Sequence, residues 1–244
     1  MPRSGSDAAF ARLHPDIQRW VWSQGWQSLR PIQADAVPVI LDRVSDVVIS
    51  APTAGGKTEA AFLPILSDLA VQEARGRLGV LCVSPLRALI NDQARRLQSM
   101  AEASDLRVQA WHGDVRSGKQ SFWKRPAEVL LITPESLEAM LMRRSRSFEP
   151  LARTLRYVVV DELHAFLSGE RGAQLQSLLR RVEALASAEI PRVALSATLA
   201  DPAHAGVFLR PSRSRPVANI RPSEHAGSEL RVVLKVMLDQ APVT

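Results

Sequence analysis

The run Ala51-Pro-Thr-Ala-Gly-Gly-Lys57-Thr58 combines paired glycines with a lysine and a hydroxyl group. It follows the apolar run VVIS and precedes residues 59–69, whose helical apolar pattern is interrupted only by Pro64. A loop between a strand and a helix can bind polyphosphate, because its backbone N–H groups and the helix N-terminus favour anions. Glycine lets the backbone approach the phosphates, Lys57 would reach the β- and γ-phosphates, and the Thr58 hydroxyl would bind Mg²⁺. The predicted nucleotide-binding residues are Thr53, Ala54, Gly55, Gly56, Lys57 and Thr58; the alternative is a structural turn.

A second chemical group lies about a hundred residues later, where LRYVVV ends in Asp161-Glu162-Leu163-His164. A strand that delivers two carboxylates to the carboxyl edge of a parallel sheet brings them beside the phosphate loop. We therefore expect Asp161 to hold Mg²⁺ and Glu162 to orient and deprotonate the water that attacks the γ-phosphate. Lys57, Asp161 and Glu162 are the candidate catalytic residues. Acids favoured at a solvated helix N-terminus are the alternative, and His164 either couples the site to another loop or is satisfied locally.

The elements that would position these groups alternate along the chain. Six β-branched runs are separated by longer amphipathic stretches: VVIS, LGVLCVS, RVQAWH, EVLLITP, LRYVVVD and RVALSAT. This alternation predicts an α/β fold with a parallel sheet covered by helices on both faces. Residues 10–24 have helical apolar spacing and predict one leading helix, with Pro15 tolerated in its first turn. Cys82, the single cysteine, lies inside an apolar run and is expected to be a buried, inert thiol.

Bulk composition limits the class of protein. The chain has 244 residues, 46% hydrophobic content and a net charge of +6, with an isoelectric point near 10.3. A basic chain fits a partner that carries phosphates, although a GC-rich coding sequence would produce the same excess of arginine. No run of about 18 apolar residues is present, and the N-terminus has no apolar stretch. We therefore predict a cytoplasmic protein without a membrane partner.

The sequence also suggests three parts. Residues 1–28 would form the N-terminal helix and the approach to the core, and residues 29–205 the nucleotide-binding domain. Beyond Leu199, prolines recur at positions 202, 211, 216 and 222, so residues 206–244 are predicted to be a linker and the start of a second domain. Within that part, residues 229–238 form one more strand-like run.

Six motifs in order resemble those of the first motor domain of superfamily 2 helicases of the DEAD/DEAH type. They are GWQSLRPIQ, APTAGGKT, SPLRALINDQ, TPESL, DELH and SAT, which resemble motifs Q, I, Ia, Ib, II and III. LHPDIQRW and TEAAFLPIL look most like the large-helicase-related (Lhr-type) group. The resemblance covers roughly residues 10–210. It implies a RecA-like three-layer sandwich, with ATP and Mg²⁺ as cofactors and DNA or RNA as partner.

Matched residue by residue, the resemblance implies further roles. Gln33 would read the adenine edge through its amide, and Trp26 would stack on or flank the base, unless it is a core aromatic. Ser196 and Thr198, with His164, would link the nucleotide state to movement of a strand, a simple strand-end turn being the alternative.

The resemblance also implies a nucleic-acid surface that tracks a phosphodiester backbone. Its residues would be Pro85, Arg87, Gly113, Asp114, Thr133 and Glu135. Thr133-Pro-Glu is also typical of a helix N-terminus. For Trp111, His112 and Trp123, core packing is favoured over contact with bases. Arg143, Arg144, Arg146 and Arg153 either extend the basic surface or form a solvated face.

Helicases of this type complete their ATPase site with arginines from a second, similar domain. Nothing in this chain resembles that domain, so we expect either a piece of a longer protein or a short chain that borrows its second half. The leading hypothesis is an ATP-dependent helicase or translocase. The alternative is a nucleotide-gated module that binds nucleic acid or protein without motor activity. A small-molecule phosphotransferase is disfavoured, because six motifs would have to be accidental.

Overall fold

A computed structural model describes residues 5–52, 55–72, 74–112, 119–199 and 201–222. Thr53, Ala54, Gly113, Asp114 and the strand-like run at 229–238 lie outside these residues. The helices are α1 (Gly5–Ala11), α2 (Pro15–Ser23), α3 (Pro31–Asp42), α4 (Lys57–Val71), α5 (Arg87–Glu102), α6 (Lys119–Lys124), α7 (Pro134–Ala152), η1 (Leu163–Phe166), α8 (Gly169–Ala186) and α9 (Pro202–Leu209). The strands are β1 (Asp46–Ser50), β2 (Val80–Val83), β3 (Val108–Trp111), β4 (Val129–Ile132), β5 (Tyr157–Val160), β6 (Arg192–Ser196) and β7 (Val217–Ile220).

The described strands form a parallel sheet in the order β3-β4-β2-β5-β6-β1-β7. Each of the six predicted strand runs contains one of these strands, so the predicted α/β fold is confirmed. In the register, Ser50 pairs with Ser196 and Val83 with Val160. Because the strands are parallel and in step, the loops after β1, β2, β5 and β6 all emerge at one edge of the sheet.

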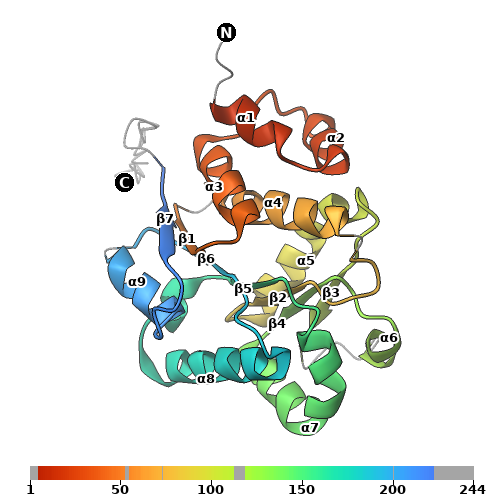
Figure 1. Cartoon of the computed structure of the whole chain (residues 1–244), viewed down its shortest axis with the longest axis vertical. Helices are drawn as coiled ribbons and strands as arrows, with labels where there is room; N and C mark the ends of the chain where they lie inside the picture. Colours follow the sequence, from red (N-terminus) through yellow and green to blue (C-terminus); the bar gives the residue numbers. More distant parts are fainter. Residues whose placement is uncertain (1–4, 53–54, 73, 113–118, 200, 223–244) are drawn as a thin grey trace, which may run out of the picture.

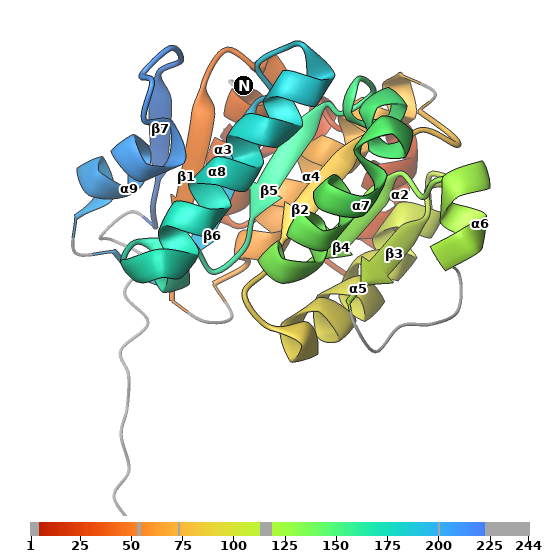
Figure 2. The ribbon, with the colours of Figure 1, turned by 90° about the horizontal axis from the view of Figure 1, so that it is seen from below.

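Helices cover both faces of the sheet (Figure 1). One face carries α3, α4 and α5, with α1 and α2 beyond them, and Figure 2 shows α7 and α8 crossing the other face. Alternate strand residues enter different cores, since successive side chains point to opposite faces. Val47 and Ile49 pack on the α4 side, for example, whereas Val48 packs on the α8 side. In the described part of the chain, no helix combines the length and apolar character needed to cross a bilayer.

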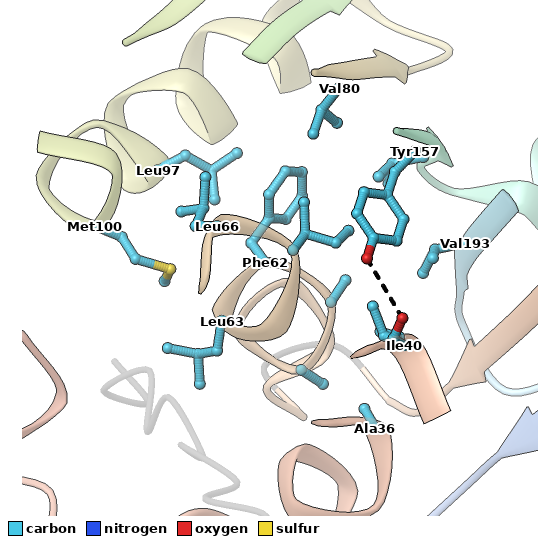
Figure 3. Close-up of a cluster of buried hydrophobic side chains, with 14 of the residues drawn as sticks. Ala36, Ile40, Phe62, Leu63, Leu66, Val80, Leu97, Met100, Tyr157 and Val193 are labelled. Carbon is cyan, nitrogen blue, oxygen red and sulfur yellow. Dashed lines mark hydrogen bonds between the residues drawn. The ribbon is translucent and has the colours of Figure 1, made fainter. Parts of the chain in front are cut away.

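The core on the α4 side is built around α4 (Figure 3). Phe62 and Leu66 are fully buried there, facing Leu97 from α5 and Tyr157 from β5. The Tyr157 hydroxyl donates to the Ile40 carbonyl at 3.4 Å, which gives the buried phenol a partner. Cys82 is also fully buried, as predicted, and burial raises the pKa of its thiol well above the ordinary value. The thiol is therefore held in its neutral form.

The N-terminal segment differs from its prediction. Instead of one helix over residues 10–24, α1 ends at Ala11 and α2 begins at Pro15. Proline has no N–H and blocks the preceding turn, so it starts a helix but interrupts one that would run through it. The His14 side chain caps α2 by accepting the Asp16 backbone N–H at 3.3 Å. The apolar spacing predicted for this segment is confirmed, since Leu13, Ile17 and Val21 are buried.

The region after Leu199 also differs from the expected linker. Residues Pro202–Leu209 form α9, and Val217–Ile220 form β7, which pairs with β1 through Val47 and Ala218. Asp201 caps α9 by accepting the His204 N–H at 3.0 Å, and Pro202 occupies the first helical position. The prolines therefore mark ends of elements rather than a structureless tract, and the described residues up to 222 belong to the sheet and its covering layer.

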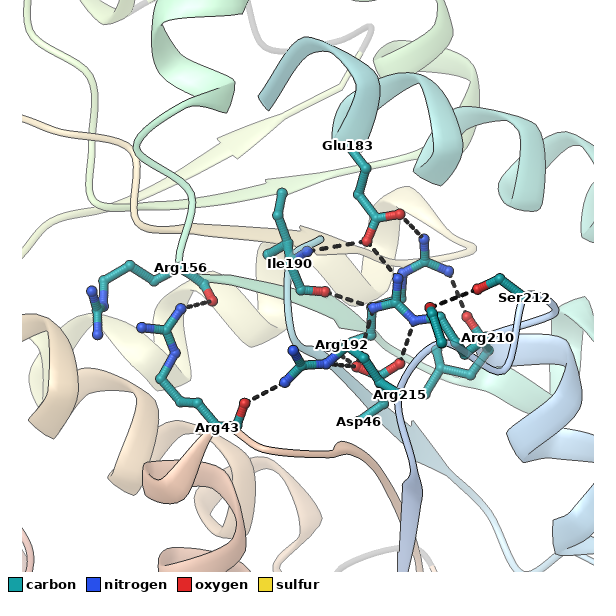
Figure 4. Close-up of polar contacts among 11 residues, drawn as sticks. Arg43, Asp46, Arg156, Glu183, Ile190, Arg192, Arg210, Ser212 and Arg215 are labelled. Carbon is teal, nitrogen blue, oxygen red and sulfur yellow. Dashed lines mark hydrogen bonds and ion pairs between the residues drawn. The ribbon is translucent and has the colours of Figure 1, made fainter. Parts of the chain in front are cut away.

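A buried ion network lies at the amino end of β1 and β6 (Figure 4). Asp46 is fully buried and accepts Arg210 Nε at 2.6 Å and the Arg192 backbone N–H at 2.9 Å. Glu183 of α8 accepts Arg210 Nη1 at 2.8 Å and Arg192 Nη2 at 2.6 Å. Arg215, just before β7, lies 3.5 Å from the Asp46 carboxylate. The network thus joins β1, β6, α8 and both ends of the α9–β7 connection.

Arg210→Ala should destabilise the chain strongly. Removing one partner from a buried ion pair leaves the other charge uncompensated, which costs about 3–5 kcal/mol. For a chain of this size we expect the melting temperature to fall by roughly 6–20 °C. Arg95→Ala is the matched control, because the Arg95 side chain is 80% exposed and its pair with Asp92 is a surface contact. Equal thermal shifts for the two variants would contradict the proposed contribution of the network.

Candidate active site

A cleft of about 390 Å³ opens at the carboxyl edge of the sheet. The described residues that line it come from the loop before α4, the start of α5, the segment after β5 and the end of β6. They include Gly55, Gly56, Lys57, Thr58, Pro85, Asp161, Glu162 and His164. The phosphate loop and the acidic box, a hundred residues apart in sequence, therefore face one space.

Two glycines shape the phosphate loop. Gly56 has a φ of 82° and precedes α4, a left-handed conformation that glycine adopts without strain. A Cβ at Gly56 would lie 3.0 Å from Gln33 Nε2, and one at Gly55 would lie 2.9 Å from the Pro52 carbonyl oxygen. A side chain at Gly55 would collide with the loop backbone, and one at Gly56 would crowd the Gln33 side chain. The residues present therefore fit a cradle for phosphates at the N-terminus of α4.

Lys57 is the first residue of α4 and folds back over the loop. Its Nζ donates to the Ala51 carbonyl at 2.7 Å and to the Pro52 carbonyl at 3.0 Å. Partial burial lowers the pKa of Lys57, while Glu162 and Asp161 act to raise it. The ammonium group is thus held between the loop and the two carboxylates, within the cleft that it lines.

Asp161 follows β5 directly and is fixed by β2. Its backbone N–H donates to the Val83 carbonyl at 2.8 Å, and the Ser84 hydroxyl donates to its Oδ2 at 3.3 Å. Burial, and then the neighbouring Glu162 carboxylate, raise the pKa of Asp161 to about 6. Ser84 was not singled out from the sequence. Its signal in the sequence is its place at the start of SPLRALINDQ, but the sequence does not specify that β2 and β5 end side by side.

Few side chains in the described part of the cleft could act as metal ligands. In the part of the chain that the structure describes, no group of three or more His, Cys, Asp or Glu side chains is placed to hold a metal ion. Mg²⁺ is commonly bound by one or two protein oxygens together with substrate phosphates. The Thr58 hydroxyl and the Asp161 carboxylate line the cleft and supply oxygens of that kind.

Glu162 has an unusual backbone. Its φ of 49° and ψ of 49° lie in the left-handed region, which non-glycine residues seldom adopt and which often marks functional sites. This turn brings its Oε2 to 3.3 Å from His164 Nδ1. The same nitrogen lies 3.4 Å from Ser196 Oγ and 3.4 Å from the Ala197 backbone nitrogen. His164 thus joins the acidic box to the end of β6, while Thr198 is exposed nearby.

The two residues assigned to adenine are placed differently from each other. Gln33 is buried at the start of α3, where its Oε1 accepts the Arg30 N–H at 2.9 Å and its Nε2 faces Gly56. Trp26 packs edge-on against Trp20, with ring centroids 5.7 Å apart, and is partly buried against the α4-side core. Neither lines the 390 Å³ cleft in the described part of the chain.

The described residues assigned to nucleic acid lie around the starts of α5 and α7. Thr133 is buried and caps α7 by accepting the Ser136 N–H at 3.2 Å, while Arg87 is exposed at the start of α5. Glu135 forms an ion pair with Arg171 at 3.0 Å, and Arg171 also donates to the Pro85 carbonyl at 2.8 Å. Arg171, which lies outside the motifs quoted from the sequence, therefore brings Pro85 and Glu135 together.

The aromatic and histidine candidates behave as the favoured alternative predicts, whereas both alternatives for the arginine cluster stay open. Trp111 and His112 are buried, Trp123 packs against the core on the α8 side, and His112 Nε2 lies 2.9 Å from Asn91 Oδ1. Core packing is confirmed for these three residues. The four arginines of the basic cluster, Arg143, Arg144, Arg146 and Arg153, are exposed.

Comparison with known proteins agrees with this geometry. The family model described as DEAD/DEAH box helicase matches residues 30–205. The chain is 35% identical over 196 residues to the ATP-dependent helicase Lhr-Core protein 2 of Thermococcus barophilus. It is 36% identical over 224 residues to the Lhr helicase/probable uracil glycosylase of Mycolicibacterium smegmatis. These matches cover 73% and 86% of this chain but only 22% and 14% of the relatives.

A solved structure shows the same architecture. The chain superposes on the Mycobacterium smegmatis helicase Lhr bound to ssDNA and AMP-PNP with a TM-score of 0.77 and 30% identity. The match covers 88% of this chain and 28% of that one. The predicted RecA-like fold and the resemblance to Lhr-type helicases are therefore confirmed. The chain belongs to the DEAD/DEAH box helicase family.

Proposed function

We propose that this chain is the ATP-binding domain of an ATP-dependent helicase or translocase, and that it binds ATP–Mg²⁺ and the backbone of a nucleic acid. The observation that carries the proposal is one cleft lined by Lys57, Thr58, Asp161 and Glu162. That set contains a cation for the phosphates, oxygens for a metal and a carboxylate for the attacking water. The family match and the Lhr-type relatives support the same assignment.

Each residue has a distinct part in hydrolysis. Backbone N–H groups at the start of α4 bind the phosphates, and Lys57 turns from the loop carbonyls towards the β- and γ-phosphates. Thr58 and Asp161 would hold Mg²⁺, which neutralises charge on the phosphates when bound. Glu162 orients the attacking water and accepts its proton. His164 and Ser196 would relay the state of the site to the end of β6, and Gln33 would read the base.

We also propose that a second motor domain completes the ATPase site. In such enzymes, arginines from the facing domain stabilise charge on the transferring phosphoryl group and raise the rate by about 10³- to 10⁵-fold. The chain spans only 14% to 22% of the two relatives compared above, which leaves ample length in those proteins for such a domain. A cytoplasmic location and a domain boundary at residue 28 stay part of the proposal.

Measurements on these 244 residues test the proposal directly. We expect weak binding of ATP–Mg²⁺, slow hydrolysis and no duplex unwinding, because the chain supplies one wall of the catalytic cleft. A fluorescent ATP analogue measures the first, phosphate release the second and a labelled duplex the third. Robust turnover stimulated by nucleic acid in this chain alone would contradict the requirement for a second domain. Absence of any ATP binding would contradict the proposed function itself.

The second candidate is a nucleotide-gated binding module without motor activity. The acidic box, in which Asp161 and Glu162 are both present, favours turnover over this alternative. The two are separated by measuring ATPase activity after this chain is joined to a second motor domain of the same family. Stimulation by single-stranded DNA, duplex DNA or RNA identifies a motor and its substrate, and binding without stimulation identifies the module.

A further inference from the structure

Arg171 occupies a position that local helix energetics disfavour. It is the third residue of α8, in the first turn, where the helix dipole disfavours a cation. Its contacts outside the helix account for the position. The guanidinium donates to the Pro85 carbonyl at 2.8 Å and to Glu135 Oε1 at 3.0 Å, and its Cζ lies 5.7 Å from the centre of the Phe166 ring. One side chain therefore contacts three segments that are far apart in the sequence.

The three segments are functionally distinct. Pro85 lies between β2 and α5, and Glu135 lies in the first turn of α7, both in the predicted nucleic-acid surface. Phe166 ends η1, which begins directly after Glu162. Close packing holds η1 against the start of α8, because a Cβ on Gly172 would lie 2.1 Å from the Phe166 carbonyl oxygen. The guanidinium is thus attached to the segment that carries the acidic box.

We propose that Arg171 is a positioning residue: it fixes the Pro85 segment and the start of α7 relative to each other for nucleic-acid binding, and ties both to the acidic box. This inference rests on the proposed function. Partial burial acts to raise the pKa of Glu135, but hydrogen bonds from its backbone, Arg171 and Thr133 outweigh it and lower the pKa. Glu135 is then ionised at neutral pH, as the pair with Arg171 requires.

The negative charge of Glu135 allows a test in which two explanations predict opposite changes in nucleic-acid affinity. A carboxylate repels a polyanion, so simple electrostatics predicts that Glu135→Ala tightens nucleic-acid binding. A positioning pair predicts the opposite, since loss of Glu135 releases Arg171 from α7. Both side chains are about half exposed, at 42% for Arg171 and 57% for Glu135. Exposed pairs contribute little to stability, so both variants should fold.

The experiment measures binding of a fluorescein-labelled 20-nucleotide oligo(dT) and of the matching oligo(U) by anisotropy at several salt concentrations. Arg171→Ala and Glu135→Ala should each weaken oligonucleotide binding by about tenfold. The double variant should bind the oligonucleotides no more weakly than Arg171→Ala does. The affinity for a fluorescent ATP analogue should stay within about twofold. Gln174→Ala is the matched control, because Gln174 joins α8 to Glu138 of α7 one turn further along without reaching Pro85. The affinity of Gln174→Ala for each oligonucleotide and for the ATP analogue should stay within about twofold of that of the unmodified chain.

Several results would overturn the positioning role. Tighter or unchanged binding by Glu135→Ala would show that the carboxylate acts only by repulsion. A fall of about 0.7 in the salt slope for Arg171→Ala would show a direct phosphate contact. Equal losses for Gln174→Ala would show a general effect of α7–α8 packing. If the unmodified chain binds neither oligonucleotide, the proposed function fails and the positioning role fails with it; a bound oligonucleotide with unaffected variants refutes the positioning role alone.

Discussion

Glu162→Gln should lower the rate of ATP hydrolysis by about 10²- to 10⁴-fold, the usual contribution of a general base. Glutamine keeps the shape of the side chain but cannot accept the proton of the attacking water. ATP binding should stay within about twofold, because Lys57 and the loop before α4 are unchanged. The backbone of residue 162, at a φ of 49°, is equally accessible to glutamine and glutamate, so a folding defect is not expected.

The turnover of Glu162→Gln is best measured after joining the chain to a second motor domain, where the unmodified rate is high enough to quantify. Phosphate release gives the rate, and a fluorescent ATP analogue gives the affinity. Glu170→Gln is the matched control, since Glu170 is an exposed glutamate at the start of α8 and should retain full activity. Undiminished turnover in Glu162→Gln would remove this residue from its catalytic role.

Lys57→Ala should weaken ATP–Mg²⁺ binding by about 10- to 100-fold. Hydrogen bonds to charged groups contribute about 1.5–3 kcal/mol, and 1.4 kcal/mol corresponds to a factor of ten in affinity. Loss of the ammonium also removes the cation that faces Asp161 and Glu162, which leaves the carboxylates to repel the phosphates. A titration of this chain with a fluorescent ATP analogue measures the effect.

Lys124→Ala is the control for Lys57→Ala, because Lys124 is an exposed lysine at the end of α6. Both variants lose one positive charge, and they differ only in where that charge lies. Circular dichroism melts of both variants exclude unfolding as the cause of weaker binding. Equal ATP affinity in Lys57→Ala and Lys124→Ala would show that the loop does not bind phosphates through this side chain.

Local signals carried most of the fold prediction. Strands such as VVIS and EVLLITP are short, β-branched and buried on both faces, and each of the six runs contains a strand of the sheet. The predictions that differ from the structure concern segments in which a proline begins a helix. Pro15 begins α2 and divides the leading helix, and Pro202 begins α9, which continues into the linker expected from residue 206. The short strand β7 is held in the sheet by its pairing with β1. No local sequence pattern predicts that pairing.

The sequence alone identifies the Gly-Gly-Lys-Thr loop, the Asp-Glu pair and the parallel sheet that carries them. These features are local, because each depends on neighbouring residues and on strand or helix periodicity. The contacts of Ser84 with Asp161, of Arg171 with Pro85 and Glu135, and of Arg210 with Asp46 are visible only in the folded chain. Those contacts join residues 36 to 164 positions apart. Their energies depend on distance and burial in space, and the order of residues along the chain specifies neither.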